Sequence, residues 1–124
     1  MSKGRILVVD DEEIVRTSCI RTLSPEGYEV KLAKNGVEGL KMASEDRFDL
    51  VLTDLKMPDM DGIEVLRIIK EKWPETAVII VTGYQTVDTA VKAIKLGAYD
   101  YIEKPFTPDA LISAVAEAMA NRQK

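Results

Sequence analysis

Short apolar runs alternate with longer amphipathic stretches along this chain, and the alternation occurs five times. The runs at residues 6–9, 50–52 and 78–81 contain no polar residue, which is typical of strands buried on both faces of a sheet. The stretches between the runs place apolar side chains at helical spacing. We therefore predict strands at 5–10, 28–33, 49–53, 77–81 and 99–102, and helices at 12–24, 36–46, 61–72, 86–96 and 107–121.

Regular alternation of strands and helices predicts an α/β fold with one parallel sheet and helices on both of its faces. The run at 28–33 alternates polar and apolar residues, and the run at 99–102 is mixed, so both favour edge strands. The strand order 2-1-3-4-5 satisfies these constraints. No linker, repeat or low-complexity segment interrupts the pattern, which predicts a single domain over residues 1–124.

Composition narrows the functional classes. The chain has 17 basic and 21 acidic residues, which argues against a surface for nucleic acid or anionic membrane. No apolar run approaches the roughly 20 residues of a membrane span, and the first run is too short for a secretory signal. The single cysteine, Cys19, cannot form an internal disulfide, so we expect a cytoplasmic protein. The absence of histidine excludes histidine-based catalysis, phosphohistidine carriers and histidine metal sites.

Reactive side chains follow four of the five predicted strands. Asp10 and Asp11 follow the first, Asp54 the third, Thr82 the fourth and Lys104 the fifth. The carboxyl ends of parallel strands share one edge, where open α/β sheets bind ligands. Two carboxylates ~4 Å apart repel by about 1 kcal/mol in water and about 4 kcal/mol near a protein surface, so a hard divalent cation such as Mg²⁺ is expected between them. Together these groups suit phosphoryl transfer.

Four sequence segments at domain spacing make this pattern specific. They read VVDDE at 8–12, LTDLKMPDMDG at 52–62, VTGY at 81–84 and GAYDYIEKPF at 97–106. In this order they resemble the receiver domain of bacterial two-component response regulators, most closely that of nitrogen-regulator-type transcriptional activators. The resemblance covers essentially the whole chain and implies a flavodoxin-like, doubly wound (βα)5 fold.

The resemblance also implies roles for individual residues. Asp54 would be the phosphoryl acceptor. Asp10 and Asp11 would hold Mg²⁺ together with Asp54, and the main-chain carbonyl of Lys56 would complete the protein ligands.

A second group of residues would respond to the phosphoryl group. The hydroxyl of Thr82 would move toward it, and Lys104 would pair with it, with a cis peptide bond between Lys104 and Pro105. Tyr101 occupies the position of an aromatic switch residue. Tyr84, two positions after Thr82, would hinder the approach of water and slow hydrolysis of the phosphoryl-aspartate.

The implied function is a signalling switch rather than an enzyme with an external substrate. A sensor histidine kinase would donate the phosphoryl group, and the signal would pass through the face formed by the fourth helix, fifth strand and fifth helix. The expected targets are an attached output domain or effector protein, a phosphorylation-dependent homodimer, or both. No membrane partner and no direct nucleic-acid contact are expected.

Three other functions compete with this interpretation. A Mg²⁺-dependent phosphatase of the haloacid dehalogenase type would need a second acid two residues after the nucleophile, where this chain has Lys56. A flavodoxin-like cofactor binder would need a small, polar phosphate loop after the first strand, where this chain is acidic. A purely structural module would leave Asp10 and Asp11 as helix caps.

Overall fold

The computed structural model describes residues 2–83 and 86–121 and contains one parallel sheet in the order β2-β1-β3-β4-β5. The strands are β1 (Arg5–Val9), β2 (Glu29–Ala33), β3 (Leu50–Thr53), β4 (Ala77–Thr82) and β5 (Asp100–Glu103). The helices are α1 (Glu13–Leu23), α2 (Gly36–Glu45), α3 (Gly62–Lys72), α4 (Val87–Lys95) and α5 (Pro108–Asn121), and a 3-10 turn η1 (Ser24–Glu26) follows α1. The predicted doubly wound (βα)5 fold, strand order and edge strands are confirmed.

The helix boundaries differ from the prediction by one residue at several amino and carboxyl ends. Asp61 and Thr86 fall inside the predicted helices, but each precedes its helix and accepts a hydrogen bond from a main-chain N–H in the first turn. Thr107 caps α5 in the same way, as its position before Pro108 predicts. A side-chain oxygen at this position satisfies an N–H group that has no partner within the helix. Helices α3 and α4 therefore each begin one residue later than predicted.

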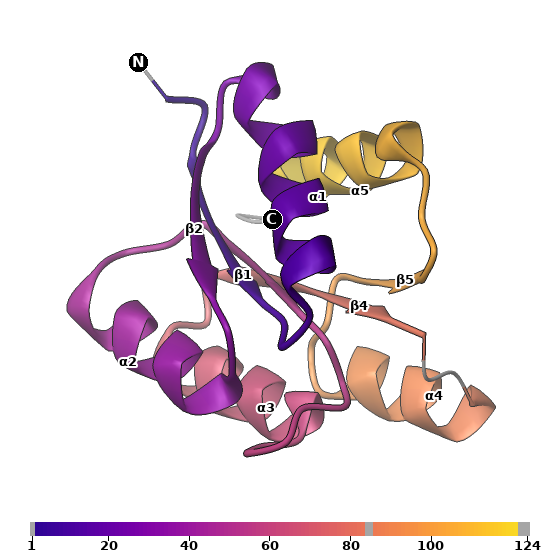
Figure 1. The fold of residues 1–124 in the computed structure, drawn as a ribbon. Helices are drawn as coiled ribbons and strands as arrows, with labels where there is room; N and C mark the ends of the chain where they lie inside the picture. Colours follow the sequence, from indigo (N-terminus) through magenta and orange to yellow (C-terminus); the bar gives the residue numbers. More distant parts are fainter. Residues whose placement is uncertain (1, 84–85, 122–124) are drawn as a thin grey trace.

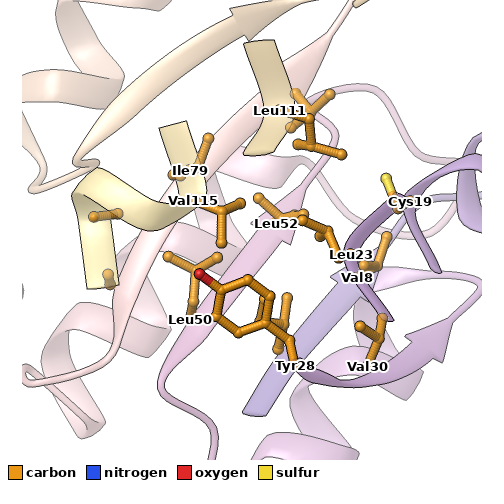
Figure 2. Close-up of a cluster of buried hydrophobic side chains, with 14 residues drawn as sticks. Val8, Cys19, Leu23, Tyr28, Val30, Leu50, Leu52, Ile79, Leu111 and Val115 are labelled. Carbon is orange, nitrogen blue, oxygen red and sulfur yellow. The ribbon is translucent and has the colours of Figure 1, made fainter. Parts of the chain in front are cut away.

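Helices α1 and α5 cover one face of the sheet, and α2, α3 and α4 cover the other (Figure 1). Side chains of successive strand residues point to opposite faces, so β1 contributes Val8 to one core and Leu7 to the other. Figure 2 shows the first core, in which Leu23 of α1 and Val115 of α5 pack against Leu52 of β3. Because both faces of the central strands are covered, the runs at residues 6–9, 50–52 and 78–81 within them are apolar, as the sequence predicted.

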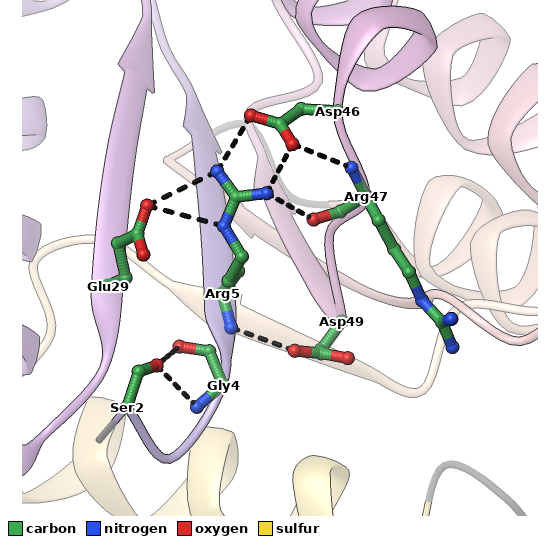
Figure 3. A network of polar contacts seen from close by, with 7 residues as sticks. All are labelled: Ser2, Gly4, Arg5, Glu29, Asp46, Arg47 and Asp49. Carbon is green, nitrogen blue, oxygen red and sulfur yellow. Dashed lines mark hydrogen bonds and ion pairs between the residues drawn. The ribbon is translucent and has the colours of Figure 1, made fainter.

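Arg5 anchors the amino end of the sheet. Its guanidinium bonds both carboxylate oxygens of Asp46, at 2.5 and 2.8 Å, and lies 3.2 Å from Oε2 of Glu29 (Figure 3). It also donates to the carbonyl of Arg47, while its main-chain N–H donates to Asp49. These contacts join β2, β1 and the segment before β3 at the end of the sheet opposite the predicted site.

None of the helices in the described ranges is long and apolar enough to cross a membrane.

Candidate functional site

Main-chain hydrogen bonds extend the strand pairing beyond β1 and β3 and place two acidic residues together. The N–H of Asp54 donates to the carbonyl of Val9 at 3.1 Å, and the N–H of Asp10 donates to the carbonyl of Ala33 at 3.1 Å. Both aspartates are nearly fully buried, with exposed fractions of 2% for Asp10 and 5% for Asp54. They therefore lie at neighbouring strand ends, as the order of the sheet predicts.

Lys104, which directly follows the edge strand β5, brings its ammonium group to these carboxylates. Its main-chain N–H donates to the carbonyl of Thr82, which fixes it next to the end of β4. Its Nζ lies 2.8 Å from Oδ2 of Asp10, 3.0 Å from Oε1 of Glu12 and 3.2 Å from Oδ2 of Asp54. One ammonium group thus contacts three carboxylates that come from two separate segments of the chain.

Glu12 is the residue of this cluster that the sequence interpretation missed. Within the described part of the chain, carboxylate oxygens of Asp10, Glu12 and Asp54 lie within 4.8 Å of one another, and Asp11 is exposed and outside this group. A local signal existed, because aspartates often accept a hydrogen bond from the N–H two residues later. Asp10 does so with the N–H of Glu12 at 2.9 Å, and the side chain of Glu12 lies over Lys104.

The charges in the cluster affect each other strongly. Burial raises the pKa of Asp10, and the hydrogen bonds from Lys104 and the N–H of Glu12 offset this only in part. Burial by itself would lower the pKa of Lys104, but its hydrogen bonds to Asp10 and Glu12 and the charge of Asp54 outweigh burial and raise it. The ammonium therefore keeps its charge in this buried position.

The donor atoms of the cluster suit a hard divalent cation. Carboxylate oxygens are the ligands that Mg²⁺ prefers in proteins. Here three of them converge, and a single ammonium leaves an excess of negative charge. Asp10, Glu12 and Asp54 are the residues that the structure brings close enough to share an ion. The ligand roles predicted for Asp11 and for the carbonyl of exposed Lys56 stay predictions.

The remaining predicted residues lie on the strands next to the cluster. Thr82 is buried at the end of β4, beside Lys104. Tyr101 is half-buried in β5, and its hydroxyl lies 3.2 Å from the hydroxyl of Thr89 in α4. The peptide bond between Lys104 and Pro105 is cis, as the resemblance implied. Tyr84 lies outside the described residues, so its effect on hydrolysis stays a prediction.

The loop of residues 56–60, which follows Asp54, is held by main-chain contacts at both of its ends. The N–H of Gly62 donates to the carbonyl of Leu55 at 2.8 Å. A Cβ atom at position 62 would lie 1.9 Å from the carbonyl oxygen of Asp54, so this approach requires glycine. The start of α3 is thereby packed against the backbone of the acceptor position, and the loop of residues 56–60 connects two fixed points.

Comparisons with known proteins identify the family to which this chain is related. The family described as "Response regulator receiver domain" matches residues 6–116. A putative NtrX-like response regulator of Rickettsia conorii is 44% identical over 120 residues, which are 95% of this chain and 25% of that protein. The transcriptional regulatory protein ZraR of Klebsiella oxytoca is 47% identical over 116 residues, 94% of this chain and 26% of that protein. The chain thus spans about a quarter of the length of these relatives.

Solved structures show the same fold. A CheY-like receiver domain of Methanospirillum hungatei superimposes with a TM-score of 0.94 at 37% identity and covers 98% of each chain. The beryllofluoride-activated NtrC4 receiver domain, solved as a dimer, has a TM-score of 0.91 at 42% identity and covers 95% of this chain and 98% of that one. This chain therefore belongs to the family of response regulator receiver domains, and its relatives include transcriptional activators of the nitrogen-regulator type.

Proposed function

We propose that this receiver domain is switched by phosphorylation of Asp54, with a phosphohistidine of a sensor histidine kinase as the donor. In this step a carboxylate oxygen of Asp54 attacks phosphorus, the phosphorus–nitrogen bond of the donor breaks, and its electron pair stays on the imidazole. The observation that carries the proposal is the contact of 3.2 Å between Nζ of Lys104 and Oδ2 of Asp54. It places a cation where negative charge accumulates during transfer.

Each residue of the site has a role in this proposal. Asp10, Asp11, Asp54 and the carbonyl of Lys56 would hold Mg²⁺, and the position of Glu12 makes it a further candidate. When bound, Mg²⁺ supplies positive charge that offsets the repulsion between the carboxylate and the phosphoryl oxygens. Lys104 would move its hydrogen bonds from the carboxylates to a phosphoryl oxygen.

Thr82 would couple phosphorylation to a surface. Moving a two-state equilibrium from 1:99 to 99:1 takes ~5.5 kcal/mol. Two new charge-assisted hydrogen bonds, from Thr82 and Lys104, would supply roughly 1.5–3 kcal/mol each. The sum, roughly 3–6 kcal/mol before the carboxylate contacts that Lys104 gives up are subtracted, reaches this value only at its upper end. Tyr101, which is hydrogen-bonded to Thr89 of α4, would respond when Thr82 moves, and would change the face formed by α4, β5 and α5.

The same face is our candidate for contacts with partners. Val87, Val91 and Ile94 of α4 are apolar yet 79%, 45% and 50% exposed. The related NtrC4 receiver is a dimer in its beryllofluoride-activated form, and other relatives are transcriptional regulators about four times as long as this chain. We therefore propose a phosphorylation-dependent homodimer through α4, β5 and α5 that regulates an output domain or effector. Receiver domains are signalling domains, and self-phosphorylation and self-dephosphorylation are the reactions we propose for this chain.

Intact-protein mass spectrometry after incubation with acetyl phosphate and Mg²⁺ tests the acceptor. The wild type is expected to gain one phosphoryl group, and Asp54→Asn none. Asp88→Asn, an exposed change in the first turn of α4, is the matched control and is expected to behave as the wild type. No adduct on the wild type, or an adduct that persists in Asp54→Asn, would contradict the proposal.

A further inference from the structure

We propose that Asp59 is a positioning residue for the phosphoryl-transfer site, because it ties the loop after Asp54 to the amino end of α2. This inference deepens the proposed function and rests on it. Asp59 lies in the loop between β3 and α3 and had no role in the sequence interpretation.

The cap of α2 is divided between two segments of the chain. The first N–H groups of a helix have no partner within the helix, and the residue before the helix usually supplies one. Asn35 does this only for the N–H of Glu38, at 2.8 Å. The N–H groups of Gly36 and Val37 instead donate to Asp59, at 3.1 Å to Oδ1 and 2.9 Å to Oδ2. Both oxygens of one carboxylate thus hold the start of α2 from more than 20 residues away.

A packing contact supports the same link. Met60, next to Asp59, lies so close to Gly36 that a Cβ atom at position 36 would be 2.9 Å from its Cβ and 3.2 Å from its Sδ. The loop is therefore both hydrogen-bonded to α2 and packed against it. Its ends are fixed separately, because Asp54 pairs with Val9 and Gly62 pairs with Leu55.

Asp59 is one of the contacts that hold the middle of the loop in position. Lys56 lies between the fixed end at Leu55 and the tie at Asp59, and its carbonyl is the proposed main-chain ligand of Mg²⁺. The carboxylate of Asp54 is held by its own contacts with Lys104 and with the N–H of Leu55. Loss of the tie should therefore displace the carbonyl ligand while leaving the acceptor side chain in place. Partners that orient a metal ligand typically change metal affinity by about 10- to 100-fold.

Asn35→Ala is the matched control for Asp59→Ala. Each change removes a side-chain cap from the first turn of α2, but only Asp59→Ala releases the loop. Titration with Mg²⁺, followed by amide chemical shifts in NMR spectra, should show an affinity about tenfold weaker for Asp59→Ala than for Asn35→Ala. Asp59→Asn keeps one acceptor oxygen and should recover part of this loss. Equal Mg²⁺ affinities in the two alanine variants would overturn the proposal.

Amide hydrogen exchange separates this inference from the proposed function. In metal-free protein, Asp59→Ala should speed exchange at residues 55–60, whereas Asn35→Ala should leave these amides as protected as in the wild type. This result does not depend on phosphorylation, so a wild type that takes up no phosphate would refute the proposed function and still leave the tie measurable. A phosphorylated wild type with unchanged exchange in Asp59→Ala would refute the tie alone.

Discussion

The ammonium of Lys104 lies 3.2 Å from Oδ2 of Asp54, although 50 positions separate the two residues in the chain. The same ammonium contacts Asp10 and Glu12, so it stabilises three carboxylates that would otherwise repel one another. In the proposed function this cation has two successive partners, first the carboxylates and then a phosphoryl oxygen. Contact with the carboxylates affects stability, whereas contact with the phosphoryl oxygen affects signalling. The two roles can therefore be tested separately.

Lys104→Ala should destabilise the metal-free protein by about 3 kcal/mol, because it leaves buried carboxylates without their cation. Mg²⁺ should recover much of this loss, since it supplies charge to the same oxygens. Urea unfolding with and without Mg²⁺ measures both effects, and Lys70→Ala, at the far end of α3, is a lysine control outside the cluster. A Lys104→Ala variant as stable as the wild type without Mg²⁺ would show that the ammonium of Lys104 does not stabilise the carboxylate cluster.

Thr82→Ala should accept phosphate on Asp54 but lose the response of the face formed by α4, β5 and α5. The reason is that its hydroxyl is the proposed link between the phosphoryl group and Tyr101. Amide chemical shifts before and after treatment with acetyl phosphate report the response.

Thr76→Ala is the matched control for that experiment. Thr76 is also buried, precedes the same strand β4, and donates its hydroxyl hydrogen to the carbonyl of Phe48. Its loss should lower stability and leave the response intact. If the shifts in Thr82→Ala equal those in the wild type, Thr82 does not couple the site to this face.

Gly62→Ala should be destabilised by about 3 kcal/mol, although alanine favours a helix over glycine by about 1 kcal/mol. The added Cβ would lie 1.9 Å from the carbonyl oxygen of Asp54, and this steric conflict outweighs the gain in helix propensity. Gly83→Ala is the control, because the nearest atom to its Cβ would be 3.9 Å away. Thermal or urea unfolding measures the stability of the two variants. Equal stabilities would show that the close approach of Gly62 to the carbonyl oxygen of Asp54 does not require glycine.

Cys19 should resist thiol reagents near neutral pH. Burial, followed by the charge of Asp10, raises the pKa of this thiol to about 12. Reaction with a chromogenic disulfide reagent should therefore be slow in the folded protein and fast in urea. Reaction of the folded protein at the rate of the unfolded chain would show that the thiol is accessible.

The same thiol should contribute to alkaline destabilisation. Between its ordinary value of 9.0 and about 12, the unfolded chain loses the thiol proton while the folded chain keeps it. The unfolded state then binds fewer protons, so stability falls as pH rises through this window. The free energy of unfolding, measured with urea across this pH range, should fall more steeply for the wild type than for Cys19→Ala. Identical slopes would show that the pKa of Cys19 is not raised in the folded protein.

The strands, and which of them lie at the edges of the sheet, were predictable because their pattern is local. Uninterrupted apolar runs in β1, β3 and β4 and mixed runs in β2 and β5 report directly whether a strand has one or two covered faces. The predicted helix starts were one residue early at Asp61 and Thr86 because capping residues continue the sequence pattern while their backbone is not yet helical. Burial pattern therefore identifies an element more reliably than it identifies the residue at its end.

The site was predictable only in part. Asp10, Asp54 and Lys104 follow strands and Thr82 is the last residue of one, so the order of a parallel sheet is enough to bring them to one edge. Glu12 reaches the cluster because the side chain of Asp10 bonds its N–H and turns the chain, a conformation that several acidic residues in a row do not reveal. The pattern shows that acids gather at this edge but does not show which of them faces inward.

The sequence by itself determined which segments become strands and helices, which strands lie at the edges of the sheet, and which chemical groups stand at their carboxyl ends, because these depend on periodicity and on residue type. Only the tertiary structure decided that Lys104 is shared among three carboxylates, and that Asp59 rather than Asn35 holds the first two N–H groups of α2. These arrangements depend on how loops from distant parts of the chain pack together, and no local pattern carries that information.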